Sequence, residues 1–205
     1  MSAVDALESL DWAKGDGLLP AIVQHWRSGE ILMLGYMNRA ALGATRASGK
    51  VTFFSRGRQR LWCKGESSGN HLLLKSLHVD CDADCILVRA EPLGPTCHRG
   101  TPTCFADAPA LPLAFLSVLD ALVDSRHAER PPGSYTTQLF AAGLHKIAQK
   151  VGEEGVETAL AGAAQGDAEL LGESADLLFH LLVLLRARGL ALAQVVELLQ
   201  SRHSQ

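Results

Sequence analysis

The sequence lacks a long uninterrupted hydrophobic segment. Its longest apolar run, Leu177–Leu185, contains His180 and is far shorter than the roughly 20 residues that span a bilayer. The N-terminal segment, residues 1–17, carries early acidic residues and no apolar core, so it does not look like a signal peptide. We therefore expect a cytoplasmic protein that does not enter a membrane.

An excess of charge of one sign is also missing. Lys and Arg together number 19 against 22 for Asp and Glu, which gives a formal net charge of -3. A chain with this balance has no general affinity for nucleic acid or for anionic membranes, so we expect neither as a partner. Any basic binding site must be local.

The number of cysteines is odd, and the sequence contains no internal repeats. The five cysteines are better interpreted, in a cytoplasmic protein, as free thiols or metal ligands than as disulfides. The absence of repeats excludes solenoids, propellers and other repeat proteins. What is present is an ordinary globular composition, 47% hydrophobic and 20% charged, over 205 residues. That length allows one large domain or two small ones.

The first half of the chain has the short apolar and alternating patterns of β-strands. Ser-Gly turn signals at 28–29, 48–49 and 68–69 separate these runs. Asn38 can cap a short helix over Arg39–Ala47. The predicted strands are Ala21–His25, Ile31–Met37, Lys50–Ser55, His71–Val79 and Cys85–Ala90.

After Phe105 the pattern becomes helical and rich in Leu and Ala, and Pro109 and Pro112 mark the change. Helices are predicted at about 113–127, 136–163, 167–187 and 191–202. The predicted fold class is α+β. A β-rich domain over residues 1–108 precedes an all-α domain over residues 109–205.

Three aspartates and two cysteines alternate in the segment DCDADC, residues 80–85. On an extended strand Asp80, Asp82 and Asp84 would share one side. Three carboxylates so close repel each other unless a cation lies among them. Hard carboxylate oxygens suit Mg²⁺, so the aspartates are candidate magnesium ligands.

Cys81 lies on the other side of that strand and could join two later cysteines. A loop rich in Pro and Gly brings Cys97 and Cys104 back toward it. Soft thiolates suit Zn²⁺. Three of them leave a fourth position for water or substrate, as in catalytic zinc sites.

Other interpretations of this segment stay open. The aspartates alone could form a solvated turn or a calcium loop, although such a loop also needs a Gly and a distant Glu that are missing here. The three cysteines could form a purely structural zinc site. Cys63 and Cys85 are interpreted as buried thiols, with Cys85 on the aspartate side of the strand.

A basic, hydroxyl-rich segment precedes the metal-ligand candidates. It runs from Ser55 to Asn70 and contains Arg56, Lys64, Ser67 and Ser68. Cations next to exposed amides and hydroxyls can bind phosphate. The alternative is a basic loop that is simply solvated.

The helical half carries two carboxylate motifs. Their spacings of three and four residues place the acids of each motif on one helix face. Packing of the two helices could bring five carboxylates together, and their repulsion would demand divalent cations such as Mg²⁺. An isolated motif of this kind could also be a solvated helix face. The acids are Glu153, Glu154, Glu157, Glu173 and Asp176.

The pattern DCDADC…GPTCHRGTPTCF resembles the signature of the phosphoribosyl-AMP cyclohydrolase family. The upstream segments LLPAIVQHWRSGEILMLGYMN and TFFSRGRQRLWCKGESSGN fit the same family, and the similarity runs from about Trp12 to Phe105. One departure is His25, where much of the family has an acidic residue. The resemblance implies zinc on Cys81, Cys97 and Cys104, with ligands that can be shared across a dimer, and magnesium on Asp80, Asp82 and Asp84.

The reaction implied by this resemblance is hydrolytic opening of an adenine ring between N1 and C6. Alkylation at N1 makes C6 electrophilic, and zinc-bound hydroxide can attack it. His98, beside a candidate zinc ligand, is the expected proton shuttle; the alternative is a hydrogen-bond donor next to the zinc. Arg56, Lys64, Ser67 and Ser68 become candidate substrate-binding residues for a bis-phosphorylated ligand.

The later pattern PPGSYTTQLFAAGLHKIAQKVGEEGVETALAGA…ESADLLFHLLVLL resembles the phosphoribosyl-ATP pyrophosphohydrolase family, whose all-α fold is related to MazG-type pyrophosphatases. The similarity covers about Leu116 to Arg202. It implies Mg²⁺ on the five carboxylates, a catalytic role for Glu154, and contacts from Lys146 and Lys150 to the triphosphate. Gly155 inside the helix is a departure in degree, and His180 is interpreted as a packed histidine rather than a ligand.

Because the two reactions are consecutive steps on one substrate, the sequence predicts a bifunctional enzyme. The helical domain would convert phosphoribosyl-ATP to phosphoribosyl-AMP and pyrophosphate, and the β-rich domain would open the ring. A homodimer is expected, because both families are dimeric. The alternatives are one active domain beside an inactive relic, or a zinc-stabilised binding module that does not turn over substrate.

Overall fold

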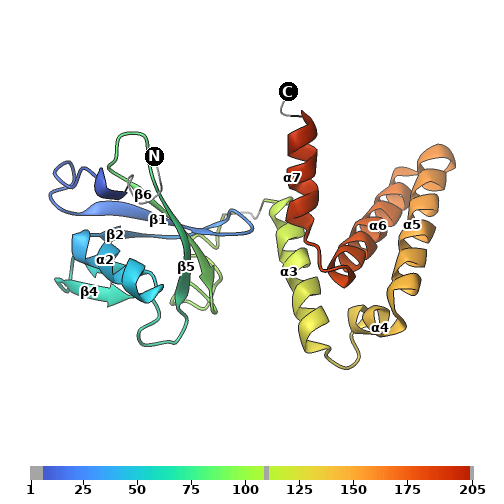
Figure 1. Ribbon diagram of the computed structural model, residues 1–205, viewed down its shortest axis with the longest axis horizontal. Helices are drawn as coiled ribbons and strands as arrows, with labels where there is room; N and C mark the ends of the chain where they lie inside the picture. The colour runs from blue at the N-terminus through green and yellow to red at the C-terminus, as the bar shows by residue number, and fades with distance from the viewer. Residues whose placement is uncertain (1–6, 109–110, 204–205) are drawn as a thin grey trace. The chain divides into compact units, whose positions relative to one another are not determined.

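The computed structural model describes residues 7–108 and 111–203, and the chain divides into two compact units, Met1–Ala114 and Phe115–Gln205 (Figure 1). The sequence predicts a domain boundary between residues 108 and 109. Pro109 lies outside the described residues, so this boundary stays a prediction. The order of a strand-rich unit followed by a helical unit confirms the α+β class.

A four-stranded sheet with the order β2-β1-β6-β5 forms the centre of the first unit. β1 (Leu19–His25) pairs antiparallel with β2 (Ile31–Met37) and parallel with β6 (Ile86–Pro92). β5 (Leu72–Val79) pairs antiparallel with β6. Alternate residues of β1 and β6 are buried in the core, as the period of two in a strand requires. The β5–β6 hairpin carries residues 80–85 in its turn.

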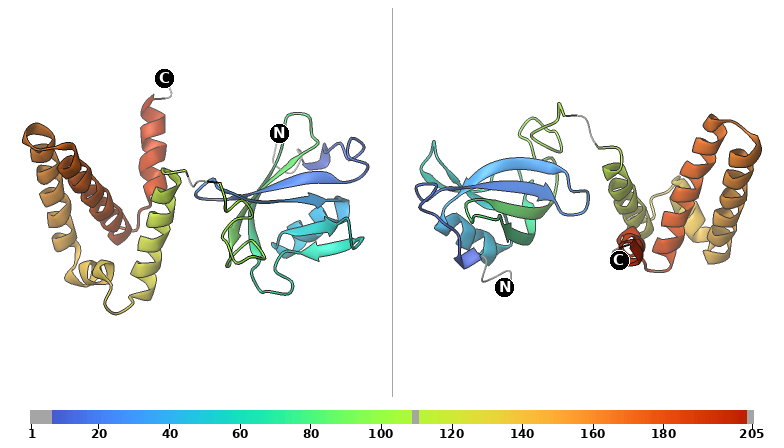
Figure 2. Two further views of the ribbon diagram at one scale, coloured as in Figure 1. Left: turned by 180° about the vertical axis from the view of Figure 1, so that it is seen from behind. Right: turned by 90° about the horizontal axis from the view of Figure 1, so that it is seen from above.

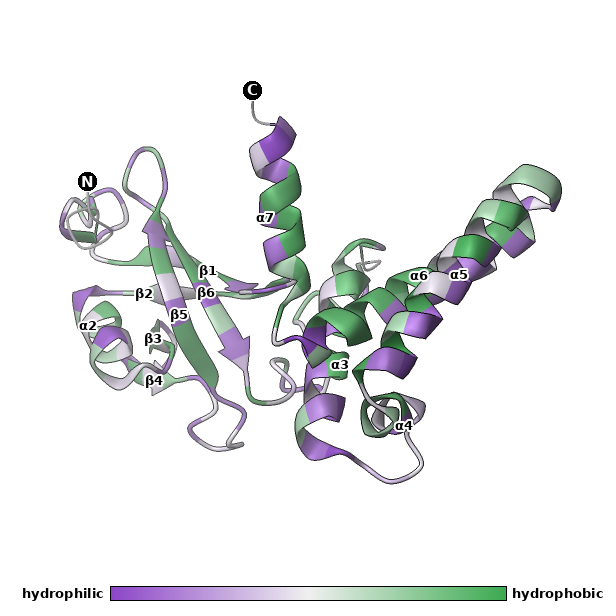
Figure 3. Ribbon diagram, turned by 45° about the vertical axis from the view of Figure 1, so that its right-hand side comes forward, coloured by the Kyte–Doolittle hydropathy of each residue, from purple (hydrophilic) through white to green (hydrophobic). Residues whose placement is uncertain are grey.

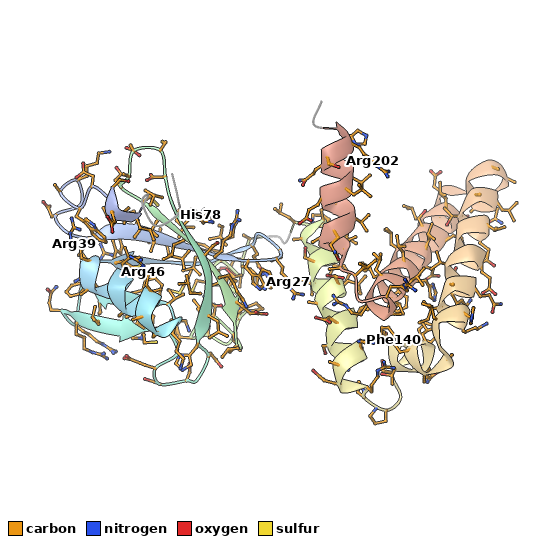
Figure 4. All side chains as sticks on the ribbon, viewed as in Figure 1. Arg27, Arg39, Arg46, His78, Phe140 and Arg202 are labelled. Carbon is orange, nitrogen blue, oxygen red and sulfur yellow. The ribbon has the colours of Figure 1, made fainter. Side chains whose placement is uncertain are left out.

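A second, smaller layer consists of a helix and a two-stranded hairpin. Helix α2 (Arg39–Ser48) begins where the Asn38 side chain accepts a hydrogen bond from the Ala41 N–H at 2.8 Å, as predicted. It precedes β3 (Thr52–Ser55) and β4 (Arg60–Cys63), which pair antiparallel. β4 was not predicted from the sequence, because this strand is short and its first residue, Arg60, belongs to a run of basic residues. Arg39 and Arg46 on α2 are labelled in Figure 4.

His25 takes part in the turn between β1 and β2. The imidazole Nδ1 accepts a hydrogen bond from the Ser28 N–H at 3.0 Å and lies 2.9 Å from the Ser28 Oγ. A carboxylate at this position could accept the same backbone N–H. Burial lowers the pKa of His25, so the neutral, accepting form is favoured. His25 therefore helps to close the turn as a hydrogen-bond acceptor.

The second unit consists of α3 (Ala114–Glu129), α4 (Tyr135–Ala142), α5 (Leu144–Ala164), α6 (Asp167–Ala187) and α7 (Leu192–His203). Helices α5 and α6 run side by side along their length (Figure 2). Their buried apolar faces meet α3 and α4 in a core that includes Ile147, Leu182 and Val183. Phe140 of α4, labelled in Figure 4, packs in this core.

One helix prediction was wrong in its extent. A single helix was predicted over 136–163, but Gly143 separates α4 from α5. Its φ of 87° lies in the region that favours glycine, so the chain can change direction there. Gly155, in contrast, lies within continuous helix, and a Cβ at this position would make an ordinary contact with Leu177 at 4.0 Å.

Candidate active sites

The three aspartates lie in the turn between β5 and β6. Ligand oxygens of Asp80, Asp82 and Asp84 lie within 4.8 Å of one another. The expectation that they share one side of an extended strand was wrong, because β5 ends at Val79 and Ala83 has a φ of 62°. Asp80 Oδ1 fixes the turn by accepting the backbone N–H groups of Asp84 at 3.0 Å and Cys85 at 2.9 Å.

A lysine that the sequence analysis missed neutralises part of this cluster. Lys14 Nζ lies 2.8 Å from Asp82 Oδ2 and 3.4 Å from Asp84 Oδ2. The hydrogen bond to Asp82 raises the pKa of Lys14 and lowers the pKa of Asp82. No local spacing links a lysine in an N-terminal turn to acids so far along the chain. The structure thus places an ammonium group beside the oxygens that were predicted to bind Mg²⁺.

Cys97 and Cys104 lie together at one side of a cavity of about 630 Å³. The Cys97 sulfur accepts a hydrogen bond from the Arg99 N–H at 3.5 Å. That N–H, with Thr101 and the Cys104 thiol, lowers the pKa of Cys97. Burial, followed by the charge of Cys97, raises the pKa of Cys104. One thiolate is therefore favoured over its neighbour, and the pair can offer two sulfur ligands.

Cys81 is not brought to this pair within one chain. It follows β5, whereas Cys97 follows β6 at the opposite end of the hairpin, where Leu72 pairs with Pro92. The 7 residues of β6 span about 20 Å at about 3.3 Å per residue. The prediction that the loop returns Cys97 and Cys104 to Cys81 was therefore wrong for a single chain. All five cysteines are free.

The loop of residues 64–70 forms another wall of the cavity. Gly65 has a φ of 86°, and a Cβ there would lie 2.5 Å from the Asn70 carbonyl, so the loop closes tightly. Lys64 is 8% exposed, and its Nζ donates a hydrogen bond to the Asn70 carbonyl at 3.4 Å. Ser67 and Ser68 also line the cavity.

Several residues that line the cavity were not predicted, and one predicted residue does not line it. Arg58, Trp62 and Thr96 face the cavity, and the buried Thr96 Oγ1 has no hydrogen-bond partner among the described residues. Arg56, predicted to bind substrate, does not line it; its guanidinium lies 3.8 Å from the centre of the Tyr36 ring. Only the basic character of the segment could have pointed to Arg58, and no pattern indicated Thr96.

His98 lies beside the cysteine pair, as its position in the sequence suggests. Its Nδ1 is 4.0 Å from the Cys97 sulfur, and the residue lines the cavity. It can therefore reach a molecule bound next to the thiolates.

The helical unit contains a second group of carboxylates. Ligand oxygens of Glu154 and Glu157 on α5 and Glu173 on α6 lie within 4.8 Å of one another. Glu154 is only 5% exposed. Burial, followed by the charges of the other two glutamates and of Asp176, raises the pKa of Glu173. Among residues 7–108 and 111–203 this group and the aspartate turn are the two sets of three clustered potential ligands.

The remaining predicted residues surround this group. Glu153 accepts a hydrogen bond from the Gln149 amide at 2.6 Å and pairs with Lys150 at 2.9 Å, and it is not one of the three clustered acids. Lys150 Nζ also lies 3.3 Å from Glu154 Oε1. Lys146 bonds Gln149 at 3.2 Å. Lys150 thus contacts two of the predicted acids, and the binding of phosphate by either lysine stays a prediction.

Within the described part of the chain no helix is long and apolar enough to cross a membrane.

Comparison with known proteins adds a direct assignment for each unit. A family model described as phosphoribosyl-AMP cyclohydrolase matches residues 33–106. A family model described as phosphoribosyl-ATP pyrophosphohydrolase matches residues 116–203. The two matches fall on the β-rich unit and the helical unit respectively.

Curated relatives extend over almost the whole chain. A "Histidine biosynthesis bifunctional protein HisIE" of Xanthomonas campestris is 65% identical over 202 residues, which cover 98% of this chain and 97% of the relative. Its counterpart in Xylella fastidiosa (strain Temecula1) is 62% identical over 198 residues, covering 97% and 95%. That of Escherichia coli (strain K12) is 57% identical over 194 residues, covering 95% of each.

The fold, the two carboxylate groups, the cysteine-lined cavity and these similarities agree in one assignment. The chain belongs to the family of bifunctional histidine-biosynthesis proteins HisIE, enzymes that combine phosphoribosyl-ATP pyrophosphohydrolase and phosphoribosyl-AMP cyclohydrolase activity.

Proposed function

We propose that the helical unit hydrolyses phosphoribosyl-ATP at the carboxylate group of α5 and α6, with Mg²⁺ held by Glu154, Glu157 and Glu173. The observation that carries this proposal is the approach of three carboxylate oxygens from two helices to within 4.8 Å. Such an approach of anions fits a divalent cation with oxygen ligands. Glu153 and Asp176, at the edge of the group, complete the predicted set of ligands.

Mg²⁺, when bound, screens the negative charge of the phosphates and lowers the pKa of a coordinated water. The chain's own cations bind the triphosphate. Lys150, which pairs with Glu153 and Glu154, is free to turn to phosphate oxygens once a cation occupies those acids. Lys146 lies one turn earlier on the same helix and extends this anion-binding face.

The β-rich unit, in this proposal, opens the adenine ring at the cavity lined by Cys97 and Cys104. The lowered pKa of Cys97 and the neighbouring thiol fit the donor set of zinc. Zinc, when bound, supplies hydroxide at neutral pH. The third thiolate is Cys81 of a second copy of the chain, because about 20 Å of β6 separates Cys81 from Cys97 within one copy.

Side chains of the cavity bind the substrate and move its protons. Lys64, a nearly buried cation, binds a phosphate together with Ser67 and Ser68. Arg56 does not line the cavity, and its contact with the substrate stays a prediction. The water oxygen adds to C6, the C6–N1 bond breaks, and N1 receives a proton. His98 is placed to carry that proton from the water to N1.

The aspartate turn is proposed to hold Mg²⁺ in exchange for Lys14. Because Cys81 lies between Asp80 and Asp82 in the sequence, a copy that lends Cys81 brings its aspartates to the same cavity. The Lys14 side chain is 41% exposed and that of Asp82 57%, so their contact lies at the surface and a cation from solvent can displace the ammonium group.

A homodimer follows from the shared cysteines, and the helical unit supports it. Large apolar side chains of this unit are exposed, including Leu171 at 72%, Phe115 at 61% and Val156 at 60%, and Figure 3 shows such hydrophobic residues along the helices. Such exposed apolar side chains support a proposed interface between copies of the chain. We expect a cytoplasmic enzyme, in keeping with its free cysteines.

Separate assays for the two reactions test the proposal. Pyrophosphate release from phosphoribosyl-ATP should be lost in Glu154→Gln, while ring opening of supplied phosphoribosyl-AMP persists. The reverse should hold for Cys97→Ser, with loss of bound zinc measured per chain. If both activities fell together in either folded variant, the assignment of one reaction to each unit would be wrong.

A further inference from the structure

A buried histidine stands behind the carboxylates of the helical unit. His180 on α6 is only 4% exposed. Its Nδ1 lies 2.9 Å from the carbonyl oxygen of Asp176, and its Nε2 lies 3.1 Å from the hydroxyl of Tyr135. Both ring nitrogens therefore have a hydrogen-bond partner. The carbonyl oxygen can only accept a hydrogen bond, whereas the hydroxyl can donate or accept one.

These partners determine which nitrogen carries the proton. A carbonyl oxygen can only accept a hydrogen bond, so Nδ1 must donate to Asp176. In a neutral imidazole Nε2 is then the acceptor, and the Tyr135 hydroxyl is its donor. The ring is thus fixed in the tautomer that carries its hydrogen on Nδ1, and that N–H donates to a carbonyl of α6 itself.

The same nitrogen also has a second, longer contact, with a proposed Mg²⁺ ligand on α5. His180 Nδ1 lies 3.5 Å from Glu154 Oε1, and Lys150 Nζ lies 3.3 Å from the same oxygen. The described donors thus both face Oε1, which leaves Oε2 of Glu154 for a cation. Carboxylate ligands oriented by an outer hydrogen-bond donor are a general feature of metal sites.

Tyr135 links the histidine to a third helix. It is the first residue of α4, which Ser134 caps, and its ring stacks on Phe179 with centroids 6.1 Å apart. The break at Gly143 separates α4 from α5. Tyr135, His180 and Glu154 therefore form a chain across α4, α6 and α5.

We infer that His180 is a positioning residue for pyrophosphate hydrolysis, which orients the Glu154 carboxylate through its Nδ1–H, and that Tyr135 fixes the tautomer that makes this possible. The inference deepens the proposed function and rests on Glu154 as a ligand. It does not depend on a change of protonation, because it requires only that Nδ1 carries a hydrogen.

The test measures binding of Mn²⁺, used as a probe for Mg²⁺, by electron paramagnetic resonance in the full-length chain. The signal of the helical unit is the part that Glu154→Gln removes. His180→Leu, which has no donor, should raise the dissociation constant of this part by about 10- to 100-fold. His180→Asn, whose amide nitrogen takes the position of Nδ1, should bind Mn²⁺ nearly as the unchanged protein does. Ring opening of supplied phosphoribosyl-AMP serves as the folding control in each variant.

Nuclear magnetic resonance of the imidazole nitrogens tests the tautomer directly. The ¹⁵N shifts that disappear in His180→Asn should identify an Nδ1–H ring, and Tyr135→Phe should shift them toward a mixture of tautomers. An Nε2–H ring in the unchanged protein would overturn the inference.

The binding series separates the possible failures. Unchanged Mn²⁺ binding in His180→Leu, or equal losses in His180→Asn and His180→Leu, would overturn the positioning role alone. Unchanged binding in Glu154→Gln would overturn the ligand assignment of the proposed function, and the inference with it.

Discussion

Mixed dimers provide the sharpest test of the cysteine arrangement. Two sulfurs on one zinc ion lie about 4 Å apart, given a zinc–sulfur distance of about 2.3 Å. In one chain, the length of β6, about 20 Å, lies between the turn that carries Cys81 and the segment that carries Cys97. A Cys81→Ser chain and a Cys97→Ser chain should therefore each be inactive in ring opening alone but complement each other when combined.

The expected recovery follows from the symmetry of the dimer. Random pairing of equal amounts makes about half of the dimers mixed, and a twofold interface gives each mixed dimer one intact site and one doubly altered site. Ring-opening activity should return to about one quarter of the unchanged level. Affinity-purified mixed dimers, co-expressed with two different tags, should reach about half.

The assay follows ring opening of phosphoribosyl-AMP, with pyrophosphate release from phosphoribosyl-ATP as a measure of folded enzyme. The control is co-expression of Cys97→Ser with Cys104→Ser, since these two residues belong to the same half-site and should not complement each other. Zinc content should rise in parallel with recovered activity. If purified Cys81→Ser/Cys97→Ser dimers stayed inactive, or if Cys81→Ser alone kept its activity and zinc, sharing of the site would be refuted.

Three further predictions concern the β-rich unit. Gly35→Ala should lower the free energy of unfolding by about 1–3 kcal/mol, because the added Cβ would lie 2.4 Å from the buried Phe53 ring; denaturant titration would check this, and Gly43→Ala, with open space around it, is the matched control. Burial lowers the pKa of His25, so the unfolded chain binds more protons and stability should fall as pH drops below about 6.5; unfolding curves of His25→Asn should lose this part of the slope, and an unchanged slope would contradict the reasoning. Lys14→Ala should tighten Mn²⁺ binding at the aspartate turn, measured by calorimetry, because the cation no longer competes with an ammonium group; weaker binding would show that Lys14 organises the turn instead.

Local sequence patterns predicted most elements of the fold. The strands predicted in the first unit agree with β1, β2, β3, β5 and β6 to within two residues at each end, because apolar alternation follows burial directly. β4 was missed because it is short and its first residues, Arg60 and Leu61, are exposed, so no apolar alternation marks it. Gly143 and Gly155 look alike in sequence, and only the backbone direction shows that one ends a helix and the other does not.

The candidate sites were predictable to the extent that they are local. Helix periodicity brought Glu154 and Glu157 to one face, and the apolar face of α6 indicated where Glu173 would meet them. The pairing of Lys14 with Asp82 involves segments far apart in the chain and has no local pattern. Cys81 and Cys97 are separated because β6 runs away from the turn that carries Cys81. A loop that returned to this turn would give the two cysteines the same spacing in sequence, so the spacing alone does not reveal the separation.

The β5–β6 hairpin has a consequence for how the family can vary in length. Exposed turns usually tolerate insertions and deletions. This turn carries residues whose distance from the cavity is set by the number of residues in β5 and β6. Removing one residue would turn the following side chains to the other face of the sheet, and removing a pair from each strand would shorten the span by about 7 Å. We therefore expect this hairpin to keep its length among relatives even where its surface residues differ.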